Sequence, residues 1–79
     1  MTRPLFTIAA DIERTWPSVH YAARPYLAAL HNLRSIEDRY GLDSAHSIVV
    51  YFLANATTWR GPDARYIKAE LKALLSNYN

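Results

Sequence analysis

Apolar residues recur at helical spacing along most of this chain. In residues 4–16, 25–39 and 63–76 they return every three or four positions, with polar side chains between them, which predicts three amphipathic helices. Gly41 is well placed to end the second of these helices in the left-handed conformation. Between the first two helices, Pro17 and Pro25 bracket a short connector, for which we expect at most one helical turn.

A further segment, residues 44–58, is apolar nearly all round when projected as a helix. Asp43 or Ser44 can cap its first turn, and a helix with so narrow a polar strip is typical of a central, buried position. A buried strand over Ile48–Leu53 is the competing interpretation, because β-branched and aromatic residues dominate there. No other strand pattern is present to pair with it, so the helix is favoured.

Together these segments predict an all-α fold, a small bundle of three to four helices around the central apolar helix of about residues 44–58. Gly61-Pro62 forces a turn between that helix and the last one. Residues 1–79 then form a single helical domain.

Composition removes several classes of protein. The chain has 79 residues and no cysteine, which excludes disulfides, thiolate zinc sites and cysteine nucleophiles. It has neither an apolar run long enough to span a membrane nor a secretory signal, so we expect no membrane association and a cytoplasmic location. A core of this size is marginally stable alone, and association with a second chain is a common remedy.

The candidates for catalytic chemistry are few. His20, His31 and His46 have no matched set of metal ligands around them, although Asp43 lies one helical turn before His46. The chain has two glycines, too few for a glycine-rich phosphate-binding loop. We therefore expect a protein that is not an enzyme and uses no cofactor or metal.

Positive charge gathers at the end of the chain, where Arg65, Lys68 and Lys72 lie on one flank of the last helix and Arg60 stands just before it. A helix, a tight turn and a second helix with basic residues near its start is the layout of helix-turn-helix proteins, so DNA binding or transcription modulation through these four residues is one hypothesis. Asp63 weakens it, since its charge would face the phosphates. The same residues also suit an ordinary solvated flank beside the core.

The outward face of the last helix carries Tyr66, Ala69 and Ala73 in place of charges. A flat surface of small residues with one aromatic anchor suits contact with another helix, which makes homodimerisation or binding of another protein the leading hypothesis. The alternative is that alanine fills exposed positions because it is the best helix former.

Residues 47–75 also carry a resemblance, in the runs Ile48-Val49-Val50-Tyr51-Phe52-Leu53-Ala54-Asn55-Ala56, Thr58-Trp59-Arg60-Gly61-Pro62 and Ala69-Glu70-Leu71-Lys72. They resemble small uncharacterised proteins of actinobacteria and their phages. The resemblance implies a short intracellular accessory protein, in the setting of a phage or its host, that acts by binding a macromolecule. It implies no activity, cofactor or catalytic residue.

Overall fold

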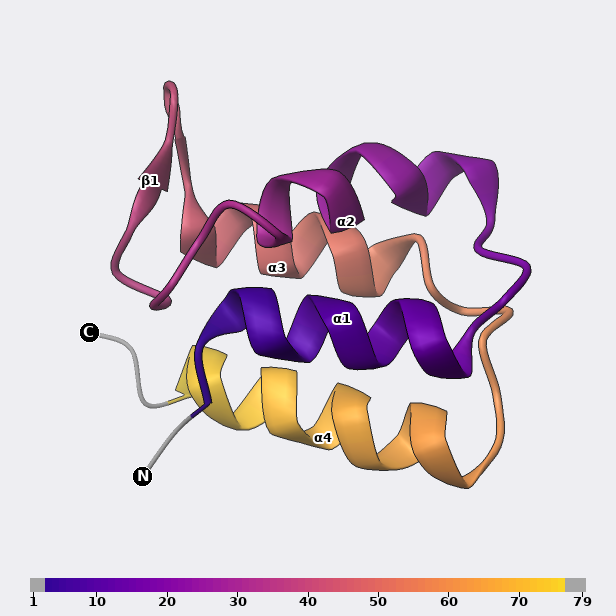
Figure 1. Ribbon diagram of the computed structural model, residues 1–79. Helices are drawn as coiled ribbons and strands as arrows, with labels where there is room; N and C mark the ends of the chain where they lie inside the picture. Colours follow the sequence, from indigo (N-terminus) through magenta and orange to yellow (C-terminus); the bar gives the residue numbers. More distant parts are fainter. Residues whose placement is uncertain (1–2, 77–79) are drawn as a thin grey trace.

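A computed structural model describes residues 3–76 and is mostly helical in that part. Its elements are α1 (Leu5–Thr15), the 3₁₀ turn η1 (Tyr21–Ala23), α2 (Arg24–Leu30), β1 (Arg39–Tyr40), β2 (Asp43–Ser44), α3 (Ala45–Ala54) and α4 (Pro62–Ser76). Consecutive α-helices run in opposite directions, and α1 lies between α2 and α4 in the view of Figure 1. The predicted helical class is confirmed, with a small two-stranded hairpin in addition.

The first and last helices follow the predicted patterns closely. The stripe Leu5, Ile8, Ala9 and Ile12 of α1 is buried. The helix ends before Trp16, whose φ of −125° and ψ of 77° are non-helical, as expected of a residue that precedes a proline. In α4 the buried side is Ala64, Ile67 and Leu71, with Leu74 and Leu75 half-buried. Tyr78, which continues the same helical spacing in the sequence and is expected on this stripe, lies outside the described residues.

The predicted helix over 25–39 is wrong beyond Leu30. Side chains in the following segment bind its backbone and replace helical hydrogen bonds: the carboxylate of Asp38 accepts from the N–H groups of Arg34 and Ser35, at 2.9 and 3.1 Å. The carbonyls of Leu33 and Arg34 then accept from the N–H groups of Phe6 and Leu5, at 2.9 and 2.8 Å. These N–H groups belong to the first turn of α1 and have no acceptor within that helix. Because α2 ends early, the carbonyls of the segment after it can accept their hydrogen bonds.

Gly41 has the positive φ that the sequence predicts, but in a different element. Its φ of +63° falls in the two-residue loop of the β1–β2 hairpin, where Tyr40 pairs with Asp43 and Arg39 with Ser44. Glycine at the first loop position suits a type II′ turn, which matches the twist of the flanking strands. The hairpin stands beyond the start of α3 in Figure 1.

Helix α3 is shorter and more exposed than predicted. The predicted cap is present, because the Ser44 hydroxyl accepts from the N–H of Ser47 at 3.1 Å, and the strand alternative over Ile48–Leu53 is wrong. The helix stops at Ala54, where the Asn55 side chain donates to the carbonyl of Tyr51 at 2.8 Å. Val50 and Tyr51 are 40% and 52% exposed. A central helix buried nearly all round is therefore not confirmed.

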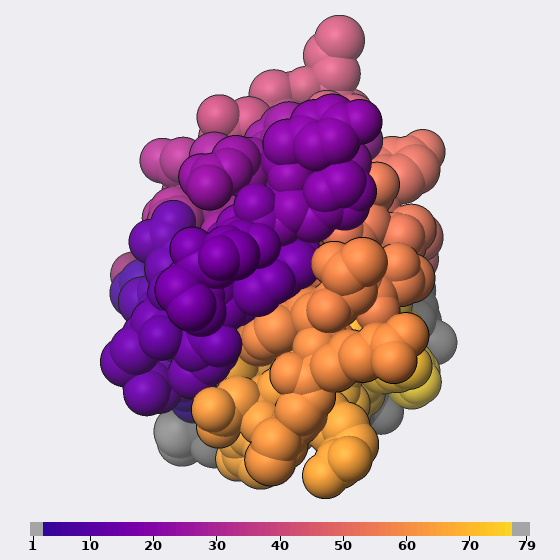
Figure 2. Space-filling model, turned by 90° about the vertical axis from the view of Figure 1, so that its right-hand side faces the viewer, coloured from indigo at the N-terminus to yellow at the C-terminus, as the bar shows by residue number. Residues whose placement is uncertain are grey.

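The buried side chains form one cluster, to which α1, α2, α3, α4 and the loop before α4 contribute. At one end Trp16 stacks on Trp59 with ring centroids 5.2 Å apart, and Phe52 meets both rings edge-on at 6.3 and 6.5 Å. Figure 2 shows this end of the molecule, where the chain after α1 lies against the loop between α3 and α4. No helix within residues 3–76 combines the length and apolar composition needed to cross a membrane.

Candidate partner-binding face

The predicted outward residues of α4 lie on the surface. Tyr66 is 72% exposed, and Ala69 and Ala73 are exposed as well. They are exposed because Ala64, Ile67 and Leu71 turn the opposite side of the helix into the core. Together with their exposed neighbours Arg65 and Lys72, they form what we call the α4 face: Arg65, Tyr66, Ala69, Lys72 and Ala73.

The cations of the α4 face have no acidic partner in the part of the chain that the structure describes. Arg65 and Lys72 are exposed and take part in none of the salt bridges found within residues 3–76. Arg60, exposed in the loop just before α4, is equally without a carboxylate there. Their charge is therefore available to a partner.

Lys68, the fourth predicted cation, has a structural role instead. Its Nζ donates to the carbonyl oxygen of Trp59 at 2.7 Å and lies 5.9 Å from the centroid of the indole ring. Partial burial lowers the pKa of Lys68, and the charges of Lys72 and Arg60 lower it further. Lys68 thus ties the loop before α4 to the helix.

The other flank of α4 is neutralised by a residue that sequence analysis did not single out. Arg3 donates to both carboxylate oxygens of Glu70, at 2.9 and 2.7 Å, and also binds the carboxylate of Asp11 in α1. Hydrogen bonds from Arg3, and then from Arg14, hold the pKa of Asp11 below its usual value. Since Arg3 and Glu70 are 67 positions apart, no local pattern could have paired them. Glu70 is thus paired on this flank, whereas Arg65 and Lys72 on the α4 face have no carboxylate partner within residues 3–76.

The relation of α3 to α4 bears on the helix-turn-helix hypothesis. The two helices run in opposite directions in Figure 1 and are joined by residues 55–61. A helix-turn-helix motif instead crosses its helices steeply after a turn of three or four residues. Asp63 is also exposed in the first turn of α4, where a recognition helix would approach the phosphates.

The histidines are dispersed. The imidazole Nε2 of His31 lies 3.1 Å from a carboxylate oxygen of Glu13, and His20 meets the ring of Tyr21 edge-on at 4.8 Å. Within residues 3–76 no group of three potential metal-ligating side chains comes together. His46 lies in the first turn of α3, as expected of a polar residue there.

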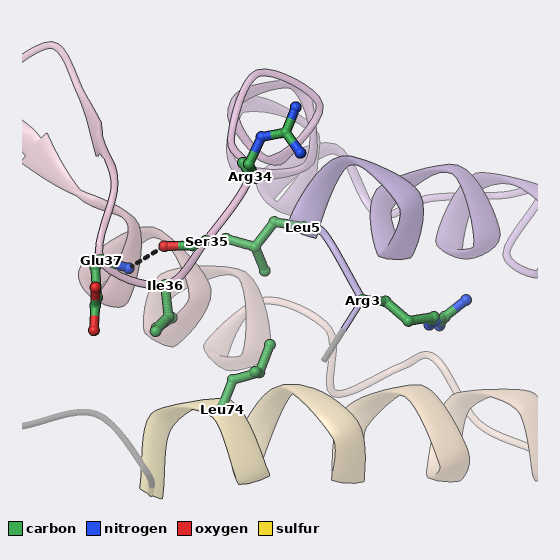
Figure 3. Close-up of a pocket in the computed structure, with 7 residues that line it drawn as sticks. All are labelled: Arg3, Leu5, Arg34, Ser35, Ile36, Glu37 and Leu74. Carbon is green, nitrogen blue, oxygen red and sulfur yellow. Dashed lines mark hydrogen bonds between the residues drawn. The ribbon is translucent and has the colours of Figure 1, made fainter. Parts of the chain in front are cut away.

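A recess of about 260 Å³ between the start of α1, the segment after α2 and the end of α4 has an apolar centre. Figure 3 shows Leu5, Ile36 and Leu74 directed toward one another, while the guanidinium groups of Arg3 and Arg34 point away. Both guanidinium groups are engaged elsewhere, Arg3 with Glu70 and Arg34 with the ring of Phe6 at 5.5 Å. The recess therefore lacks the converging polar groups of a catalytic site.

Comparison with protein-family models, with curated proteins and with solved structures finds no match for this chain. The resemblance of residues 47–75 to proteins of actinobacteria and phages stays a prediction.

Proposed function

We propose that this protein is a non-enzymatic interaction module whose α4 face binds an acidic surface of a partner protein. The observation that carries the proposal is the composition of that face: a tyrosine that is 72% exposed shares one side of α4 with two exposed alanines and two exposed cations, and these cations have no acidic partner within residues 3–76. As part of the same proposal, the protein is encoded by a phage or its bacterial host and has the accessory role that the resemblance implies.

Each part of the α4 face contributes a different element of recognition. Tyrosine is enriched among the residues that dominate binding energy, because it offers a large apolar ring and a polar tip at little entropic cost. Ala69 and Ala73 leave the helix backbone open to close approach by a partner. Arg65 and Lys72 at the border supply charge complementarity, which steers encounter and sets register.

Charge favours an acidic partner over a second copy of this chain. A symmetric dimer through the α4 face would bring the same patch of each copy together. Arg65 and Lys72 would then face the cations of the other copy, with Arg60 nearby, and such like-charge contacts oppose association. An acidic partner would instead attract Arg65 and Lys72.

Site-specific photo-crosslinking tests the proposal. A benzophenone amino acid in place of Tyr66 should give adducts with acidic proteins in extracts of the source organism, and Arg65→Glu with Lys72→Glu in the same chain should abolish them. The matched control carries the same probe at Tyr21, which is 77% exposed and lies in η1. Identical adducts from both positions, or adducts indifferent to the charge reversal, would refute the proposal. An adduct of twice the chain mass would support homodimerisation instead.

Nucleic-acid binding is the second candidate, favoured by the exposed cations Arg65 and Lys72 on α4 and Arg60 in the loop just before it. Fluorescence anisotropy with a labelled DNA duplex at low salt distinguishes it. Four phosphate contacts would give a slope of log affinity against log salt of about −3 to −4, and removing two cations would reduce its size by about 2. Arg65→Ala with Lys72→Ala is the appropriate pair, because Lys68 also holds Trp59. Absence of duplex binding at low salt would eliminate this candidate.

A further inference from the structure

A second recess, of about 270 Å³, lies between α2, α3 and the β1–β2 hairpin. Three tyrosines from these three elements line it, namely Tyr26, Tyr40 and Tyr51, and Pro25, Ala29 and Ile48 complete its apolar surface. Asp43 is the charged residue of the lining. We call this site the tyrosine pocket.

The aromatic walls of the tyrosine pocket are assembled by the tertiary fold. The rings of Tyr26 and Tyr51 lie against each other, with centroids 5.5 Å apart and planes inclined by 33°. Tyr40 and Asp43 are cross-strand partners in the hairpin, which places their side chains on the same face of the two strands. Tyr40 and Tyr51 remain 44% and 52% exposed, so the rings are accessible from solvent.

The charge of the tyrosine pocket is negative and unopposed. The carboxylate of Asp43 accepts no hydrogen bond and joins no salt bridge from any other residue of the described chain 3–76. The nearest cation in sequence, Arg39, donates through Nη2 to the carbonyl oxygen of Leu42 at 3.0 Å and does not line the recess. The lining of the pocket thus combines three tyrosines, apolar side chains and one carboxylate that has no partner within residues 3–76.

We propose that the tyrosine pocket binds a quaternary ammonium group. Such a cation is attracted to the negative faces of aromatic rings and is recognised by clusters of aromatic side chains. Its methyl groups match the apolar lining, and they donate no strong hydrogen bonds that a largely apolar pocket would leave unsatisfied. Asp43 supplies the opposing charge at the mouth of the pocket. A primary ammonium would leave some of its three donors unpaired against the apolar lining.

Binding of choline, followed by amide chemical shifts of the whole chain, tests the proposal. Choline should shift the amides of residues 26, 29, 43 and 51, whereas its uncharged carbon analogue 3,3-dimethylbutan-1-ol should bind at least about fivefold more weakly, since it lacks the cation–π attraction. Asp43→Asn and Tyr51→Leu should each weaken choline binding about three- to fivefold. Tyr21→Leu, which removes a more exposed ring outside the pocket, is the matched control and should bind as the parent does.

Two outcomes would overturn the proposal. One is equal binding of choline and the uncharged analogue, which would make the recess an apolar groove with no preference for a cation. The other is no shift with about 10 mM choline, a concentration well above a millimolar Kd. A short peptide with trimethyllysine separates the two sources of such a group: tighter binding than choline indicates a modified protein, and equal binding indicates a free head group.

Discussion

Phe52→Ala is the substitution whose effect the structure defines most sharply. Phe52 is fully buried in α3, and its ring meets Trp16 and Trp59 edge-on. The three aromatic rings join α1, α3 and the loop that leads into α4. Truncation to alanine leaves a cavity where these elements meet.

The expected loss is large relative to the total stability. A buried phenylalanine removes about 200 Å² of mostly apolar surface from water, and at about 25 cal/mol per Å² this corresponds to about 4 to 5 kcal/mol. Measured costs of Phe→Ala in protein cores are about 3 to 5 kcal/mol. A chain of 79 residues has a free energy of unfolding of roughly 4 to 12 kcal/mol. Phe52→Ala should therefore remove about 4 kcal/mol, a third or more of the stability.

Urea unfolding followed by tryptophan fluorescence measures this directly, since Trp16 and Trp59, the two tryptophans of the chain, both lie in the cluster. Phe52→Leu should retain most of the stability, at a cost of about 1 to 2 kcal/mol, because it preserves much of the volume. Tyr66→Ala removes a ring that is 72% exposed, and the free energy of unfolding should change by no more than about 0.5 kcal/mol.

The reasoning fails if Phe52→Ala costs less than about 1.5 kcal/mol, because even the smallest buried-ring truncations exceed that value. It also fails if Phe52→Ala and Tyr66→Ala destabilise equally, since burial would then not determine the cost. A reduced slope against urea in Phe52→Ala alone would point to a changed unfolded or native state, and the midpoint could not be read as a core effect.

Three further predictions concern local features. Hydrogen bonds in the folded state lower the pKa values of Asp11 and Asp38, so each ionised carboxylate stabilises the folded protein fully above the usual aspartate pKa of 3.8. This stabilisation is lost as the pH falls below that value, so the urea midpoint should drop over that range. The drop should be smaller in Asp11→Asn. Gly41→Ala should cost about 1 kcal/mol in thermal unfolding, because alanine is strained at the φ of +63°, and this strain is the whole effect, since no atom lies within 4 Å of the added methyl group. Ser44→Ala should cost about 1 kcal/mol by loss of the α3 cap, measured by the urea midpoint against the exposed control Ser18→Ala.

Each of these predictions has a contrary result. Identical acid sensitivity of the parent and Asp11→Asn would mean that the Arg3 contacts do not persist in solution. A neutral Gly41→Ala would place the hairpin loop in a conformation without positive φ. Equal stability of Ser44→Ala and Ser18→Ala would show that the cap does not stabilise α3.

The sequence by itself determined the elements whose pattern is local. In α1 and α4 the apolar stripe, the helix ends and the exposed face all follow from spacing, because side chains three and four positions apart share a side of a helix. The same geometry placed Tyr66, Ala69 and Ala73 on the surface, and the start of α4 at Gly61-Pro62 follows from backbone preference alone. The capping role of Ser44 is equally local.

The tertiary structure decided the elements in which local and long-range demands compete. Leu33 is buried, as the predicted helix over 25–39 requires, yet it lies in a loop whose carbonyls bind the first turn of α1. Spacing shows that a residue is buried, but it cannot show which backbone groups its neighbours must satisfy. Because α2 ends at Leu30, residues 39–44 are not helical and form the hairpin instead.

The candidate sites divide in the same way. The α4 face lies on one helix and was predicted from the sequence, whereas the Arg3 contacts that neutralise Glu70 join residues 67 positions apart. The tyrosine pocket takes one ring from each of α2, α3 and the hairpin. Tyr26 and Tyr51 belong to different helices, and only packing brought their rings together. A face of one helix is fixed by the 100° step between residues, while a pocket among three elements exists only once the chain has folded.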